Sequence, residues 1–90
     1  MADTTAVLER ARAAYRSGDW KTARDGFTVA RADDAATGAD LRALASCEWW
    51  LGDQRSCLEH LEAAFRVLSR DGDEVAAAET ALVIAQVRLT

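Results

Sequence analysis

Apolar residues recur along the chain at the three- and four-residue spacing of amphipathic α-helices. Five such segments can be traced, over about residues 4–17, 20–32, 38–51, 54–69 and 74–90. Val, Ile and Thr are sparse and do not alternate with polar residues, so there is little material for strands. The pattern therefore predicts an all-α protein of five helices.

Glycine and aspartate mark the joints between these segments. Gly18 suits the left-handed residue that ends one helix, and Asp19 can cap the helix that follows. Because this joint is only two residues long, the first two helices are expected to be antiparallel neighbours. Residues 37–40 and 71–74 resemble capping boxes at the starts of the third and fifth helices.

Composition narrows the class of protein. Ninety residues, half of them hydrophobic, are enough for one small domain with a thin core. Two cysteines and one histidine are too few for a disulfide framework or a zinc site, so we expect a reduced, cytoplasmic setting with no metal and no cofactor. No apolar run is long enough to cross a membrane, and we expect no membrane attachment. A net charge of −4 disfavours a nucleic-acid partner.

Groups able to support catalysis are few and poorly spaced. His60 is the only histidine, and its glutamate-rich surroundings on a predicted helix favour a surface position. Cys47 and Cys57 lack the C-x-x-C spacing of redox or zinc sites and are expected to be small buried hydrophobic residues. The chain has no Gly-rich phosphate loop and no nucleophile elbow. We therefore expect no enzymatic activity and no catalytic residue.

The Gly-Asp joint recurs 34 residues later, and its surroundings keep the same register. The equivalent pairs are Ala11 and Ala45, Gly18 and Gly52, Asp19 and Asp53, Ala23 and Cys57, Phe27 and Leu61, and Ala30 and Ala64. This 34-residue helix-turn-helix period resembles the tetratricopeptide repeat (TPR) family. The resemblance implies a TPR-like α-solenoid of two helix-turn-helix repeats, about residues 4–34 and 38–69, plus a fifth helix over about 74–90. The chain departs from the family pattern at Ala35 and Ser69, which replace the closing proline, and at Gln54, which replaces the turn aromatic.

The resemblance also implies a binding surface, because in TPR proteins the first helix of each repeat lines the ligand groove. The corresponding polar and aromatic residues are Arg12, Tyr15, Arg16, Arg42, Ser46 and Trp49. Guanidinium forks and indole faces suit carboxylates and stacked groups. The expected partner is therefore a protein or peptide of acidic character. The residues alone leave open that the arginines are merely a solvated face and that Trp49 or Trp50 packs against the fifth helix.

The last predicted helix is apolar around most of its circumference. Its apolar residues include Leu82, Val83, Ile84, Val87 and Leu89. Such a surface requires cover, either from a further helix after Thr90 or from a second copy of the chain. A self-associating structural or oligomerisation domain is therefore the alternative to an interaction module.

Residues 47–53 carry a second, shorter resemblance. Their sequence, Cys-Glu-Trp-Trp-Leu-Gly-Asp, is similar to repeat segments of actinobacterial LuxR-type transcription regulators. In those regulators the DNA-binding helix-turn-helix lies in a separate C-terminal domain. The resemblance implies a regulatory or sensing segment of a bacterial protein that acts in transcription regulation, rather than a DNA reader.

Overall fold

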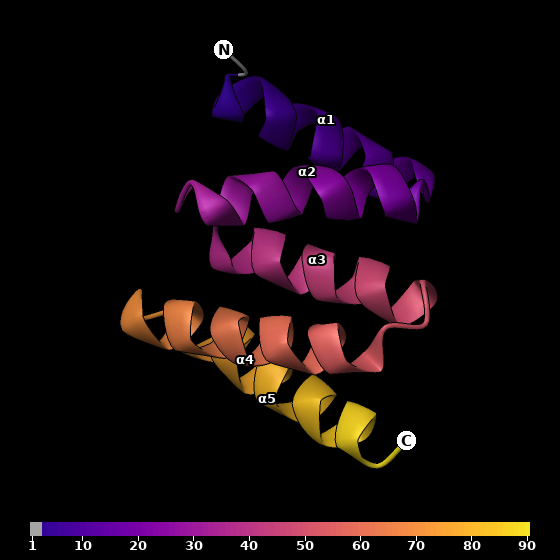
Figure 1. The fold of residues 1–90 in the computed structure, drawn as a ribbon. Helices are drawn as coiled ribbons and strands as arrows, with labels where there is room; N and C mark the ends of the chain where they lie inside the picture. The colour runs from indigo at the N-terminus through magenta and orange to yellow at the C-terminus, as the bar shows by residue number, and fades with distance from the viewer. Residues whose placement is uncertain (1–2) are drawn as a thin grey trace.

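The computed structural model describes residues 3–90, and within that range it contains five α-helices and no strand, which confirms the predicted all-α class. The helices are α1 (Thr4–Ser17), α2 (Trp20–Ala32), α3 (Gly38–Trp50), α4 (Gln54–Arg70) and α5 (Glu74–Arg88). They stack in chain order between an N-terminus at one end and a C-terminus at the other (Figure 1). Each helix packs against the next one along the chain, and α1 also contacts α3.

Three of the four joints are built on the same Gly-Asp pair, at residues 18–19, 52–53 and 72–73. In each pair the glycine has a positive φ, between 79° and 82°. The amide of the aspartate donates to the carbonyl five residues earlier, at 2.8–2.9 Å, and its carboxylate caps the next helix. The third pair corrects the expectation of a capping box at residues 71–74, because Asp73 caps α5 in the same way as its two counterparts.

The joint between α2 and α3 also ends a helix with a left-handed residue, but this residue is not a glycine. Asp34 takes the left-handed conformation, with φ of 55°, and the amide of Ala35 donates to the Ala30 carbonyl at 2.9 Å. Thr37 and Asp40 then form the predicted capping box: each side chain accepts a hydrogen bond from the backbone amide of the other residue. This joint, residues 33–37, is the longest of the four.

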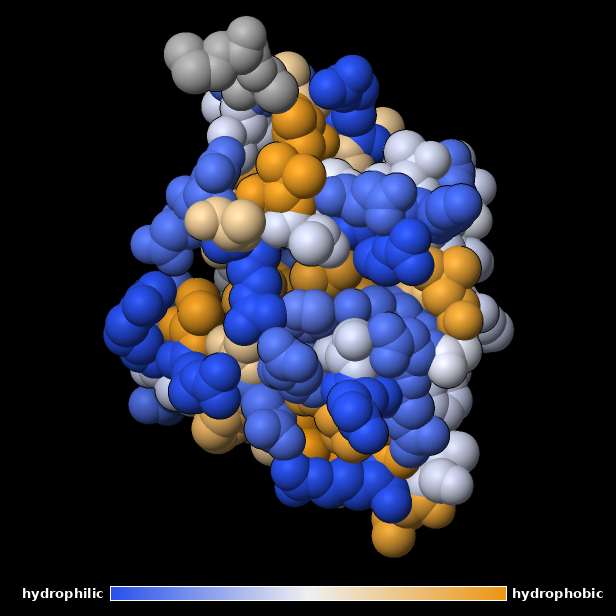
Figure 2. Space-filling model, viewed as in Figure 1, coloured by the Kyte–Doolittle hydropathy of each residue, from blue (hydrophilic) through white to orange (hydrophobic). Residues whose placement is uncertain are grey.

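The core contains both members of each pair of packing positions that lie 34 residues apart. All four pairs of packing positions, from Ala11 with Ala45 to Ala30 with Ala64, are buried. Phe27 is 1% exposed and packs among buried side chains of α1, α2 and α3, as the sequence predicts. A second cluster joins α3, α4 and α5 around Leu61 and Val87. Figure 2 shows that the face on which α4 lies in front of α5 is covered mainly by hydrophilic side chains.

The backbones of α1 and α2 approach closely at Gly26. A Cβ placed on Gly26 would lie 2.7 Å from the Cβ of Ala11 and 3.4 Å from the carbonyl oxygen of Val7. Neither atom belongs to a flexible side chain, so neither can move away without a shift of the helix. Glycine at this position therefore sets the separation of α1 and α2.

Replacing Phe27 with alanine is expected to lower the free energy of unfolding by about 3–5 kcal/mol, because it opens a cavity where three helices meet. Val29→Ala is the control: Val29 lies on the same helix but is exposed, and its loss should cost less than about 0.5 kcal/mol. Urea titrations followed by circular dichroism measure both values. An unchanged unfolding midpoint for Phe27→Ala would contradict the packing described here.

Gly26→Ala is expected to destabilise the protein even though alanine is the better helix former by about 1 kcal/mol. Overpacking against Ala11 forces α1 and α2 apart, at a cost of about 1–3 kcal/mol. The exchange Gly26→Ala with Ala11→Gly should recover most of the loss, so a double-mutant cycle on unfolding free energies isolates the contact. Independent, additive effects of the two substitutions would show that the helices do not touch there.

Candidate partner-binding surface

Two adjoining hollows lie along α3. The smaller, of about 240 Å³, is formed by α1 and α3 and is lined by Tyr15, Ala39, Arg42, Ala43 and Ser46. The larger, of about 310 Å³, is formed by α3, α4 and α5. Ser46 lines both hollows, so they meet at this residue.

The larger hollow has a mainly apolar wall. Its lining residues are Ala45, Ser46, Trp49, Trp50, Cys57, Leu61, Val83, Gln86, Val87 and Thr90. Trp49 and Trp50 keep 36% and 64% of their surface exposed, which is unusual for such large apolar side chains. Burial raises the pKa of the Cys57 thiol, so this residue adds an uncharged sulfur to the wall at neutral pH. The arrangement suits one apolar group.

Aromatic rings continue from this wall toward α1. Trp50 stacks on Trp20 of α2, with ring centroids 6.1 Å apart and planes at 15°. Trp20 in turn meets Tyr15 edge to face at 5.7 Å. Both tryptophans are thus partly accessible, and they share the larger hollow with Val83 and Val87 of α5, in agreement with the alternative that one of them lies against the fifth helix.

The six residues expected in the groove are divided among three environments. Tyr15, Arg42 and Ser46 come together in the smaller hollow, and Ser46 and Trp49 in the larger one. Arg16 is exposed in the last turn of α1 and lines neither hollow. Arg12 is bound to a carboxylate within the chain. The structure therefore brings together four of the six residues along α3 and its α1 neighbour.

Arg12 and Asp40 form a bidentate ion pair that joins α1 to the start of α3. The Nε and Nη2 atoms of Arg12 donate to the two carboxylate oxygens at 2.9 and 2.8 Å. Burial by itself would raise the pKa of Asp40, but the hydrogen bonds from Arg12 and Thr37 and the charge of Arg12 outweigh it. The pKa of Asp40 consequently lies below its ordinary value. The Arg12 guanidinium is occupied by this contact and is not available to bind a ligand.

Arg42 is held much less firmly. Its Nη1 lies 3.4 Å from a carboxylate oxygen of Glu79 on α5, and both side chains are open to solvent. Exposed pairs of this kind contribute little to stability and are screened by salt. Arg42 can therefore exchange Glu79 for the carboxylate of a ligand at small cost.

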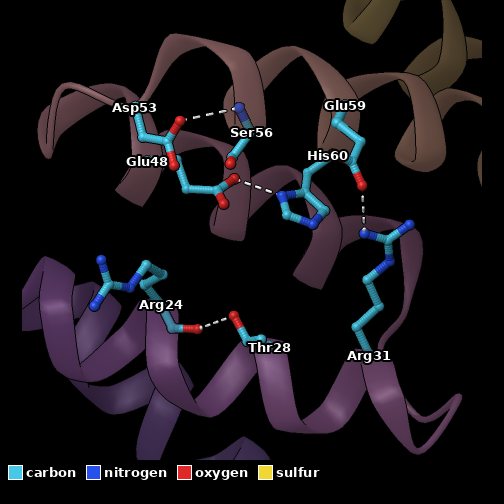
Figure 3. Close-up of polar contacts among 8 residues, drawn as sticks. All are labelled: Arg24, Thr28, Arg31, Glu48, Asp53, Ser56, Glu59 and His60. Carbon is cyan, nitrogen blue, oxygen red and sulfur yellow. Dashed lines mark hydrogen bonds and ion pairs between the residues drawn. The ribbon is translucent and has the colours of Figure 1, made fainter.

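His60 corrects the expectation of a surface position. Its Nδ1 lies 2.6 Å from Oε1 of Glu48, and the two side chains are only 12% and 5% exposed. Glu48 comes from α3 and His60 from α4, and Figure 3 shows the pair with Arg24 and Arg31 of α2 on the opposite side of the interface. Nothing in the spacing of residues 48 and 60 predicts this contact, because it depends on how α3 and α4 cross. The pair serves to join these helices.

Both cysteines are buried and free, as expected from the sequence. Burial, followed by the nearby charge of Glu48, raises the pKa of Cys47 to about 11. The thiol is therefore protonated at neutral pH and is a poor nucleophile.

A third hollow, of about 480 Å³, lies between the C-terminal ends of α2 and α4 and was not predicted. Three arginines, Arg31, Arg66 and Arg70, line it together with Asp34 and an apolar floor. Arg31 and Arg70 lie in the last turns of α2 and α4, where the helix dipole ordinarily explains an arginine, and Arg66 lies one turn earlier in α4, so their sequence positions gave no reason to group them. Two of them already contact acids, since Arg31 lies 3.5 Å from Glu59 and Arg70 lies 3.5 Å from Asp71.

The part of the chain from residue 3 onward contains no group of three or more His, Cys, Asp or Glu side chains arranged to hold a metal ion. None of the helices there has both the length and the apolar character needed to cross a membrane. Comparisons with protein-family models, with curated proteins and with solved structures find no match to this chain. Its function is therefore inferred from its own hollows, charges and packing.

Asp40→Asn is expected to lower the free energy of unfolding at neutral pH by about 1–2 kcal/mol. This is less than for a fully buried pair, because the Arg12 side chain is 42% exposed and its charge is screened. Since the folded pKa of Asp40 lies below the unfolded value, its contribution is complete above that value and is lost as the pH falls through the folded pKa. The difference between parent and variant should thus be constant down to about pH 5 and shrink below about pH 4.

Urea titrations at a series of pH values measure this difference. Asp25→Asn is the control, because Asp25 is exposed and pairs only with its neighbour Arg24. Parallel stability curves for the parent and Asp40→Asn down to the most acidic pH would contradict the role assigned to Asp40.

Proposed function

We propose that this chain is a protein-interaction module of TPR type, an α-solenoid of two helix-turn-helix repeats followed by a fifth helix. The repeated burial of positions 34 residues apart supports the proposal, as do the equivalent Gly-Asp joints at residues 18–19 and 52–53. The stacking of helices in chain order is also what a solenoid requires (Figure 1).

The observation that carries the functional proposal is an apolar hollow with exposed indole rings directly beside a loosely held arginine. Exposed aromatic side chains around a pocket are typical of the residues that contribute most to protein binding. At about 310 Å³, the larger hollow is at the lower limit of small-molecule sites, a size that suits a single side chain. Trp49 and Trp50 supply the contact area, and Arg42 supplies the charge.

The ligand that fits this pattern is a peptide segment with one large apolar anchor and one carboxylate. Arg42 and Trp49 are seven residues apart on α3, which corresponds to about 10 Å along the helix. An extended peptide covers that distance in about three residues. The anchor should enter the larger hollow while an Asp, a Glu or the terminal carboxylate, about three residues away, binds Arg42.

The cellular role proposed for the module is regulatory, as part of a bacterial protein that acts in transcription. The similarity of residues 47–53 to segments of LuxR-type regulators supports it, and these residues include the two tryptophans of the binding surface. The free buried thiols suit the reducing environment of the cytoplasm.

Peptides that pair a Leu or Phe anchor with a Glu three residues away are expected to bind the parent protein and to change its tryptophan fluorescence. Arg42→Glu and Trp49→Ala should each weaken binding at least about tenfold, or about 1.4 kcal/mol. Binding should also weaken with added salt, because the Arg42 charge is exposed. Peptides in which Gln replaces the Glu should bind Arg42→Glu and the parent alike.

Arg10→Glu is the matched control, since Arg10 is exposed on α1 and lines neither hollow along α3. It should leave the affinity unchanged, and circular dichroism should show all variants folded. If Arg66→Glu, in the hollow between α2 and α4, weakens binding while Arg42→Glu does not, the proposed surface is wrong.

A further inference from the structure

Helix α5 has two apolar faces, of which only one is used inside the molecule. Val87 is buried, and Val83 and Ile84 are half-buried against the cluster around Leu61. The sequence predicts one exposed apolar surface on this helix, but the structure divides it, because these three residues belong to the core. Leu82 and Leu89 lie on the other side and are 67% and 89% exposed.

The exposed side of α5 forms a regular seam. Its apolar residues are Val75, Ala78, Leu82, Ala85 and Leu89, all of them exposed. Their spacing alternates between three and four residues, which is the pattern of positions that interlock between two paired helices. Three large side chains on this seam are among the most exposed apolar residues of the part of the chain described, with Val75 at 71%. We refer to these five residues as the outer seam.

We infer that the outer seam is covered by α5 of a second copy of this chain, in an antiparallel arrangement about a twofold axis near Leu82. The seam is almost palindromic about this residue, with a valine seven positions before it and a leucine seven positions after it. An antiparallel partner therefore places Leu82 beside Leu82 and Val75 beside Leu89, and it brings Ala78 to within one residue of the position opposite Ala85. The alanines between the larger residues allow the two helices to approach closely.

The charges that flank the outer seam favour the same arrangement. Glu74 and Glu79 flank its first half, and Arg88 flanks its end. Antiparallel pairing brings Glu74 of each copy next to Arg88 of the other, whereas parallel pairing would place like charges together. Within one copy Arg88 contacts only the exposed Glu62, at 2.7 Å, so it remains accessible at the edge of the seam. The outer seam and its flanking charges are therefore complementary to themselves. A second copy of this chain has the matching pattern, whereas an unrelated apolar helix need not have it.

The contact area indicates a weak, reversible dimer. Fifteen helical residues extend over about 22 Å. One pair of helices of this length buries less than the roughly 1,200 Å² of a standard stable interface. We therefore expect monomers at low micromolar concentration and dimers as the concentration approaches the millimolar range.

Disulfide trapping tests both the association and its direction. Leu82→Cys should form a covalent dimer under mild oxidation, and the native Cys47 and Cys57 do not compete because they are buried. Val75→Cys alone should stay monomeric, while a mixture of Val75→Cys and Leu89→Cys should give a mixed dimer. Val29→Cys, an exposed position on α2, is the control and should not cross-link. Cross-linking of Val75→Cys to itself but not to Leu89→Cys would overturn the antiparallel arrangement.

Sedimentation equilibrium supplies the reversible measurement. The average mass of the parent should rise with concentration from 9.8 kDa toward twice that value. Leu82→Glu should stay at the monomer mass with an unchanged circular dichroism spectrum, and the matched variant Val29→Glu should behave as the parent does. A parent that remains monomeric at millimolar concentration, or a Leu82→Glu variant that dimerises equally well, would show that a second copy does not cover the seam.

Discussion

The tight reversal after a left-handed residue is the constraint on which the rest of this structure depends. A glycine with positive φ followed by a capping aspartate ends one helix and starts the next within two or three residues. Such a short joint forces each helix to lie beside the helix that precedes it. The main contacts of the fold are therefore between helices that are consecutive in sequence. The core can be thin and rich in alanine because the joints, rather than large side chains, determine which surfaces meet. Only the joint through Asp34 is longer, and it is followed by the helix that carries most of the candidate surface.

That helix, α3, is fixed on two sides by buried acids. Asp40 near its start is bound by Arg12 of α1, and Glu48 near its end is bound by His60 of α4. Any other register would leave a carboxylate buried without its partner, which costs far more than the pair itself contributes. With alanines at many core positions, side-chain shape alone discriminates poorly between registers. The two polar pairs supply that discrimination, and they hold Arg42, Ser46 and the tryptophans in a constant position.

Features that depend on neighbouring residues could be predicted from the sequence, and features that depend on how helices cross could not. The helix bounds, the capping box at Thr37 and the burial of Phe27 follow from local spacing and from one internal comparison. The partner of Arg12, the position of His60 and the basic hollow around Arg66 required the relative orientation of helices distant in sequence. For α5 the sequence showed apolar residues all around, but only the contact with α4 determines which of them face inward. Most residues of the candidate surface could thus be named from the sequence. The sequence did not predict that Arg12 would be bound to Asp40 instead of lining that surface.

Packing each helix mainly against its neighbours in sequence also determines how such a chain reaches its structure. The contacts span short stretches of chain, so little entropy is lost in closing loops before they form, and helical proteins of this kind fold in microseconds to milliseconds. The same arrangement leaves the two ends least supported, since α5 has α4 as its main neighbour. Opening can therefore begin at α5 without disturbing the cluster around Phe27. A second copy bound to the outer seam must leave before α5 can open, so its binding slows the exchange of the α5 backbone protons with solvent.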